Sequence, residues 1–325
     1  MKRTILGTIG TPLVRVTSPP GTVIGAKLEA FNPGKSAKDR PALAMIEAAE
    51  AAEDLDPGDE IVEATSGNTG IGLAIVCAVK GYKLRIVMPS SKSVERRRLL
   101  RAYGASIELV DGQMDDARKR ADEIAATGAI QLDQFGNEAN AESHYRGTAE
   151  ELLDQVGDRS IDAFVATVGT GGTLTGIGRR LREEFSDLTI VAVEPEENAV
   201  LSTGQPGSDG FQGMGPGFVS DLLDVNLIDQ IETVNLPAAE AECRRLAREE
   251  GILAGQSSGA ALIAARRVAE RIAEADSGPK RATDNSTAGG RGEASIPTDV
   301  PLVVTVFPDS GERYLSAGTF DDPAA

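Results

Sequence analysis

The chain has 325 residues, which is enough for one large or two medium-sized domains with buried cores. Its net charge of −17 argues against a nucleic-acid partner, because the phosphates would be repelled. No run approaches the roughly 20 apolar residues that a membrane-spanning helix needs, and no signal peptide is visible. We therefore expect a cytoplasmic protein without a membrane partner.

The distribution of charge and the few cysteine and histidine residues indicate the protein's environment and exclude some kinds of catalytic site. Arginine supplies most of the positive charge, and an acidic, lysine-poor surface suits high salt, so a halophilic source is one interpretation. A solvated acidic face without ecological meaning is the other. Cys77 and Cys243 lie in apolar segments without metal-ligand spacing and are expected to be buried free thiols. The only histidine, His144, leaves little room for histidine-based catalysis.

The predicted elements alternate between strands and helices along the chain. In the first half we expect strands at 11–16, 22–30, 60–64, 84–89 and 106–110. We expect helices at 41–53, 71–79 and 115–126, and a charged helix that follows the strand at 84–89 and ends at residue 103. In the second half we expect helices at 142–155, after 173, at 237–250 and after 255, and strands at 163–168, 189–194 and 301–307. Residues 198–220 are expected to form an irregular loop, and residues 275–299 a disordered insertion. Such alternation predicts an α/β fold with mostly parallel sheets covered by helices.

Residues 32–40 are the first candidate for chemistry. They read Asn-Pro-Gly-Lys-Ser-Ala-Lys-Asp-Arg between a short strand and an alanine-rich helix. Ser36 or Asp39 can cap that helix, which places Lys38 near the positive end of the helix dipole. A desolvated amine there tends toward its neutral, nucleophilic form. A surface turn with two solvated cations is the alternative interpretation.

Three loops rich in glycine and hydroxyl residues open helices: 65–70, 169–173 and 255–259. In a doubly wound sheet such loops meet at the carboxyl ends of the strands, where ligands bind. The 169–173 loop presents backbone N–H groups at a helix N-terminus, which suits an anion such as a phosphate. The dinucleotide pattern fails because Leu174 stands where the third glycine belongs, and no P-loop pattern occurs.

A phosphate loop together with a poised lysine fits pyridoxal 5′-phosphate. Its aldehyde would condense with Lys38, and Ser257 would face its pyridine nitrogen. A hydroxyl would not hold that nitrogen protonated, which favours elimination at the β carbon over transamination. Asn68 could reach the ring oxygen, and the 65–69 loop could bind an amino-acid carboxylate. The alternatives are a plain helix cap for Ser257 and a capped helix start for the 65–69 loop.

The motifs together resemble the cysteine synthases (O-acetylserine sulfhydrylases) and cystathionine β-synthases. These are fold type II pyridoxal-phosphate enzymes, relatives of the tryptophan synthase β subunit. The resemblance covers residues 6–316, and it includes a closing signature at Pro308–Tyr314. It implies the Schiff-base lysine Lys38, the cofactor ligands Asn68, Gly169, Thr170, Gly171, Gly172, Thr173 and Ser257, and the substrate-binding residues Thr65, Ser66, Gly67, Asn68, Thr69 and Gln134.

The resemblance also implies an architecture. We expect a smaller, mobile N-terminal domain at 35–145 that carries the substrate loop. A larger domain formed by residues 1–34 and 146–325 would bind the cofactor phosphate. The cofactor would lie in the cleft between two α/β domains, and the protein would be a homodimer.

The expected reaction is β-replacement of O-acetyl-L-serine by sulfide. It would give L-cysteine and acetate through an α-aminoacrylate, with Lys38 removing the Cα proton. A sister enzyme that uses O-phosphoserine or homocysteine is the alternative, because residues 146–151 resemble a branch that includes phosphoserine-using enzymes. Residues 198–230 hold no Lys or Arg for a leaving phosphate, which favours O-acetylserine. A nucleotide-binding α/β module is a more distant alternative.

Overall fold

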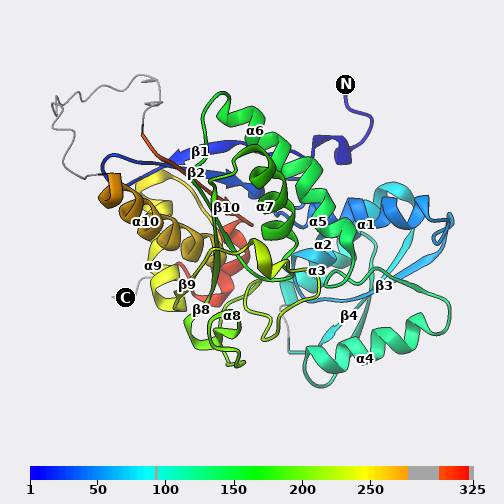
Figure 1. The fold of residues 1–325 in the computed structure, drawn as a ribbon. Helices are drawn as coiled ribbons and strands as arrows, with labels where there is room; N and C mark the ends of the chain where they lie inside the picture. The colour runs from blue at the N-terminus through cyan, green and yellow to red at the C-terminus, as the bar shows by residue number, and fades with distance from the viewer. Residues whose placement is uncertain (92–93, 277–299, 322–325) are drawn as a thin grey trace.

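The described part of the chain builds two separate β-sheets (Figure 1). The structure is a computed structural model that describes residues 1–91, 94–276 and 300–321. The larger sheet has the order β1-β2-β10-β7-β8-β9, with strands Leu13–Val16, Val23–Leu28, Leu302–Phe307, Ala163–Thr167, Thr189–Pro195 and Gln230–Val234. The smaller sheet has the order β5-β4-β3-β6, with strands Ser106–Val110, Lys83–Pro89, Glu60–Ala64 and Ile130–Gln131. All neighbouring strands are parallel except the antiparallel pair β1 and β2.

Helices cover both sheets. The α-helices are α1 (Asp39–Ala51), α2 (Asn68–Lys80), α3 (Val94–Ala102), α4 (Met114–Ala125), α5 (Glu138–Ser143), α6 (Glu150–Val156), α7 (Gly172–Glu184), α8 (Val200–Thr203), α9 (Leu236–Arg245) and α10 (Gln256–Asp276). Two π-helical turns lie at His144–Ala149 and Leu246–Glu250. Short 3-10 helices lie at Ile5–Thr8, Glu29–Phe31, Glu196–Asn198, Val225–Leu227 and Gly311–Ala317. None of the helices described is long and apolar enough to cross a membrane.

The cores show why both sheets are covered on two faces. In β10, Val303 and Phe307 belong to a core with α9 and α10, whereas Val304 and Val306 belong to a core with α6 and α7. Side chains of a strand alternate between faces, so a strand that is apolar on both faces must be buried on both. The smaller sheet likewise has one core against α1 and α2 and another against α4. The predicted α/β fold with mostly parallel sheets is confirmed.

Several local predictions hold and others do not. The strands at 60–64 and 106–110 have the predicted bounds, and both cysteines are buried free thiols in helices. The predicted helix at 142–155 is instead interrupted by the π-helical turn. No sequence pattern predicted β6, which has two residues, or β9, which is partly exposed. The predicted domain boundaries stay a prediction.

Two more predictions concern the ends of helices. Neither Ser36 nor Asp39 caps α1: its N-cap is Lys38, without a side-chain cap, and the Asp39 carboxylate accepts the Gly34 N–H instead. Helix α10 runs to Asp276, so the insertion expected at 275–299 cannot begin at 275. Its residues 277–299 lie outside the described part of the chain.

A buried ionic network anchors the first turn of α1. The Arg40 guanidinium lies 2.8 Å from the Glu29 carboxylate and 2.7 Å from the Glu151 carboxylate, so it joins α1 to the 3-10 helix that follows β2 and to α6. Lys27 lies 2.7 Å from Glu151 on the same network. Although burial alone would raise the pKa of Glu151, its bonds to Arg40 and Lys27 lower it to about 2. Arg40 follows Lys38 by two positions, so this network fixes the backbone from which Lys38 projects.

We therefore expect Arg40→Ala to lower the free energy of unfolding by about 3–5 kcal/mol, because it leaves the buried Glu29 charge without its ion-pair partner. Urea denaturation measures the loss. Arg179→Ala is the control: Arg179 pairs with Glu138 and Asp224 at a more exposed site, and such pairs contribute about 1 kcal/mol or less. Equal losses for the two variants would contradict a special role for the buried network.

Candidate active site

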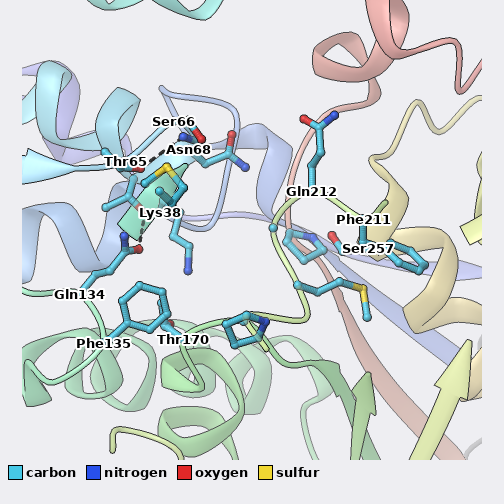
Figure 2. Close-up of a pocket in the computed structure, with 18 of the residues that line it drawn as sticks. Lys38, Thr65, Ser66, Asn68, Gln134, Phe135, Thr170, Phe211, Gln212 and Ser257 are labelled. Carbon is cyan, nitrogen blue, oxygen red and sulfur yellow. Dashed lines mark hydrogen bonds between the residues drawn. The ribbon is translucent and has the colours of Figure 1, made fainter. Parts of the chain in front are cut away.

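A cavity of about 900 Å³ brings the predicted motifs together (Figure 2). The segments that follow β3, β7 and β10 all line it, so it lies at the carboxyl ends of strands from both sheets. This is where open parallel sheets bind ligands. Of the site residues predicted from the sequence, all but Gly172 line the cavity: Lys38, Thr65, Ser66, Gly67, Asn68, Thr69, Gln134, Gly169, Thr170, Gly171, Thr173 and Ser257.

The structure separates the two lysines of the 32–40 segment. Lys38 lines the cavity, and Figure 2 shows its side chain extending from α1 between the 65–68 loop and the wall that carries Thr170. Burial lowers the pKa of Lys38 to about 8, and the Asp309 carboxylate partly opposes this shift. Lys35 has a left-handed φ of 58° and is exposed, with its amine paired to Glu312. Of these two lysines, only Lys38 is placed to offer a neutral amine inside the cavity.

The loop at 65–69 and Gln134 form one polar wall. The Thr69 hydroxyl donates to Gln134 Oε1 at 2.6 Å, so the Gln134 NH₂ group is left to donate elsewhere. Helix α2 begins at Asn68, and the first N–H groups of a helix have no partner inside it. A carboxylate bound here would therefore meet backbone N–H donors and a side-chain amide.

A buried carboxylate supports the Gln134 segment from behind. Glu63, in β3, is buried and accepts hydrogen bonds from the backbone N–H groups of Leu132, Asp133 and Gln134. Burial and, to a smaller extent, the nearby Asp133 carboxylate raise the pKa of Glu63 to about 7, against the opposing effect of the N–H bonds. Glu63 thereby connects the central part of the smaller sheet to the residue that faces the cavity.

The 169–173 loop has the form of an anion site. Gly171 is the N-cap of α7 with a φ of +88°, a conformation that favours glycine. At Gly172 a Cβ would lie 2.2 Å from Asn140 Oδ1, so this glycine allows close packing behind the loop. Behind Thr173, His144 Nε2 lies 3.2 Å from the threonine hydroxyl. Burial lowers the pKa of His144 well below its usual value, so this ring is neutral.

The third predicted loop completes the cavity. Ser257 is the second residue of α10, is almost fully buried, and lies on the side of the cavity away from Gln134 in Figure 2. A lysine amine, an anion-binding helix start and a buried hydroxyl thus surround one space. This donor set fits the aldehyde, phosphate and pyridine nitrogen of pyridoxal phosphate.

Comparison with known proteins decides the family. The chain matches the family described as "Pyridoxal-phosphate dependent enzyme" over residues 5–277. The chain belongs to this family of enzymes. It is 47% identical over 321 residues to a cysteine synthase of Staphylococcus aureus, which is 96% of each chain.

Solved structures agree with this family and its two-domain fold. O-ureido-L-serine synthase has a TM-score of 0.88 at 40% identity, over 99% of this chain and 96% of that one. A cysteine synthase (OASS) from Entamoeba histolytica has a TM-score of 0.87 at 35% identity, over 99% and 91% of the two chains. The expected fold type II architecture and the dependence on pyridoxal phosphate are therefore confirmed for this pyridoxal-phosphate enzyme.

Some cavity residues were not found from the sequence. Arg96 donates to Ser66 O and Gln212 Oε1, both at 2.8 Å. The Arg118 guanidinium lies 4.7 Å from the Phe135 ring centre and 5.4 Å from that of Phe218. Residues 198–230 hold no Lys or Arg, as the sequence shows, but these two arginines line the cavity from other segments of the chain. Both arginines come from helices of the smaller sheet, and no local sequence signal places them in the cavity.

Two other segments line the cavity, although they were not predicted from the sequence as part of the site. Residues 209–214 line it with Phe211, Gln212 and Met214, although the sequence suggested only an irregular loop. Asp309 follows β10 inside the closing signature and also lines the cavity. Its place at the carboxyl end of a central strand was the signal that could have identified it.

We expect Gln134→Glu to raise the KM for an amino-acid substrate roughly 10- to 100-fold while the protein stays folded. Thr69 could still donate to the new side chain, but an oxygen would replace the NH₂ group and repel the substrate carboxylate. Steady-state kinetics measures the change. Gln131→Glu, at the end of β6 and away from the cavity wall, is the control. A similar KM for both variants would count against Gln134 as a substrate ligand.

Proposed function

We propose that this pyridoxal-phosphate enzyme is a cysteine synthase that replaces the acetoxy group of O-acetyl-L-serine with sulfide. The observation that carries the proposal is the shared cavity: the Lys38 amine lies between a loop suited to a carboxylate and a loop suited to a phosphate. The names of the Staphylococcus aureus and Entamoeba histolytica relatives support the same activity.

We propose these roles for the cofactor-binding residues. Gly169, Thr170, Gly171, Gly172 and Thr173 hold the cofactor phosphate through the start of α7. Ser257 faces the pyridine nitrogen with a hydroxyl, which does not force that nitrogen to be protonated. Asn68 faces the ring oxygen, and Lys38 binds the aldehyde carbon covalently. When bound, pyridoxal phosphate supplies an electron sink that acidifies the Cα–H bond of the substrate.

We propose that the remaining groups hold the substrate and move its proton. Thr65, Ser66, Gly67, Asn68, Thr69 and Gln134 bind the substrate carboxylate. The Lys38 amine would take the Cα proton, since a pKa of about 8 leaves part of it neutral near pH 7. Acetate leaves Cβ with the bonding electrons, sulfide then forms the new Cβ–S bond, and the protonated Lys38 amine returns the proton to Cα. Movement of the 35–145 domain would exclude water during these steps.

The lysine assignment has a direct test. Lys38→Ala should abolish the visible absorption of the lysine-bound cofactor and lower kcat by several orders of magnitude, because both the covalent bond and the base are lost. Lys35→Ala should retain the absorption and most activity, since Lys35 points away to Glu312. Bleaching of the Lys35 variant with a coloured Lys38 variant would reverse the assignment.

A second candidate function has its own observation. Arg96 and Arg118 line the cavity, and a guanidinium is a strong partner for a leaving phosphate. An enzyme that uses O-phosphoserine is therefore the second candidate. The acceptor is a separate question: a relative at 40% identity is named O-ureido-L-serine synthase, so similar chains make different β-substituted products.

The substrates are tested by comparing kcat/KM for O-acetylserine and O-phosphoserine with sulfide, and then with homocysteine. We expect O-acetylserine with sulfide to be the best pair. The second candidate predicts instead that O-phosphoserine is preferred and that Arg118→Met lowers its kcat/KM roughly 10- to 100-fold. In that case Arg118→Met should lower kcat/KM for O-acetylserine only slightly, because the leaving acetate carries less charge than a leaving phosphate.

We also propose that the protein is a cytoplasmic homodimer. The family resemblance supports the dimer, and sedimentation of the purified protein would measure its oligomeric state. The halophilic interpretation rests on the net charge of −17, and activity measured at molar salt would test it.

A further inference from the structure

The side-chain amide of Asn68 is held at both of its ends. Its Nδ2 donates to Asp309 Oδ2 at 2.7 Å, and its Oδ1 accepts from the Arg313 guanidinium. A guanidinium can only donate, so the amide atom beside Arg313 has to be the oxygen. The contact with Arg313 therefore fixes which end of the amide is nitrogen.

This orientation leaves one of the two hydrogens on Asn68 Nδ2 free to donate to another acceptor. An amide NH₂ group carries two hydrogens, and Asp309 takes one. Asn68 lines the same cavity as Lys38, so the second hydrogen is available to an acceptor inside it. Were the amide reversed, its oxygen would lie beside the Asp309 oxygen and its NH₂ group beside the guanidinium.

We propose that Asp309 and Arg313 are positioning residues that orient the Asn68 amide so that its nitrogen donates to the ring oxygen of the bound cofactor. This inference rests on the cofactor placement proposed above. Asp309 and Arg313 act through Asn68, and neither is assigned a chemical step.

Asp309 is built into its position. It is 2% exposed, lies two residues after the end of β10, and its Oδ2 also accepts from the Tyr314 hydroxyl at 2.8 Å. Within the described residues its Oδ1 is buried and has no hydrogen-bond partner. A Cβ at Gly255 would lie 2.1 Å from that oxygen, so the chain keeps a glycine where the carboxyl group packs against it. Little room remains for Asp309 to turn away from Asn68.

Arg313 connects the same amide to the lysine segment. Its guanidinium donates to the Gly34 carbonyl oxygen as well as to Asn68. Gly34 lies four positions before Lys38, on the turn that leads into α1. One side chain thus sets the position of the Asn68 amide relative to the lysine that binds the cofactor.

The test is a double-mutant cycle on cofactor affinity. The Kd of pyridoxal phosphate is measured by absorbance titration of the folded apoenzyme for wild type, Asp309→Ala, Asn68→Ala and the double variant. Loss of one oriented hydrogen bond should raise the Kd roughly 10-fold in Asp309→Ala. With Asn68→Ala already present, Asp309→Ala should change the Kd less than about twofold, because the group it orients is gone.

Two further variants complete the design. Asp309→Asn keeps an oxygen that can accept from Asn68, so its Kd should stay near that of wild type. Glu312→Ala is the matched control. Glu312 directly precedes Arg313 in the chain, but it is exposed and pairs with Lys35. If Asp309→Ala does not fold, Arg313→Met replaces it in the same cycle.

The outcomes are distinct. An unchanged Kd in Asp309→Ala, or the same loss with and without Asn68, would overturn the inference, since the second result means that Asp309 acts only on the general structure. A failure of the proposed function looks different: the wild-type protein would bind no pyridoxal phosphate, or the visible band would survive Lys38→Ala.

Discussion

An amine held at the start of a helix and shielded from water loses the hydration that stabilises its charge. Lys38 is in this situation: it lies at the N-cap of α1, and burial lowers its pKa to about 8. The residues around Lys38 hold the amine in this position. The Arg40 network fixes the helix start, and Asp309 offers a limited opposing charge. The 65–69 and 169–173 loops line the same cavity with the hydrogen-bond donors that we propose for the anionic groups of the ligands.

The two-sheet architecture explains how so many donors reach one cavity. A parallel strand ends where the helix after it begins, so each βα connection brings unpaired N–H groups to the same edge. Helices α2 and α7 begin in this way after β3 and β7, one in each sheet. In the proposed function each sheet supplies one anion-binding loop, so the distance between the substrate carboxylate and the cofactor phosphate would depend on how the sheets pack together.

The sequence predicted most of the parts that are local. The 65–70 and 169–173 loops are continuous segments whose glycine and hydroxyl content reveals their conformation, and strong apolar runs predicted the strands around them. It could not predict contacts between distant residues. Asn68 and Asp309 are 241 positions apart, and Arg118 reaches the cavity only because α4 packs beside the segment that carries Phe135. β6 was missed because two residues are too few to show a pattern.

The burial of the Arg40 network has a consequence for ionic strength. Dissolved ions screen charges that water can reach, but they screen charges inside a protein much less. Surface pairs such as Arg179 with Glu138 therefore weaken as salt is added, whereas Glu29, which is 0% exposed, keeps its attraction to Arg40. The geometry around Lys38 should thus be less sensitive to salt than the surface of this highly acidic protein. As the salt concentration rises, the surface ion pairs would therefore weaken before the geometry around Lys38 changed.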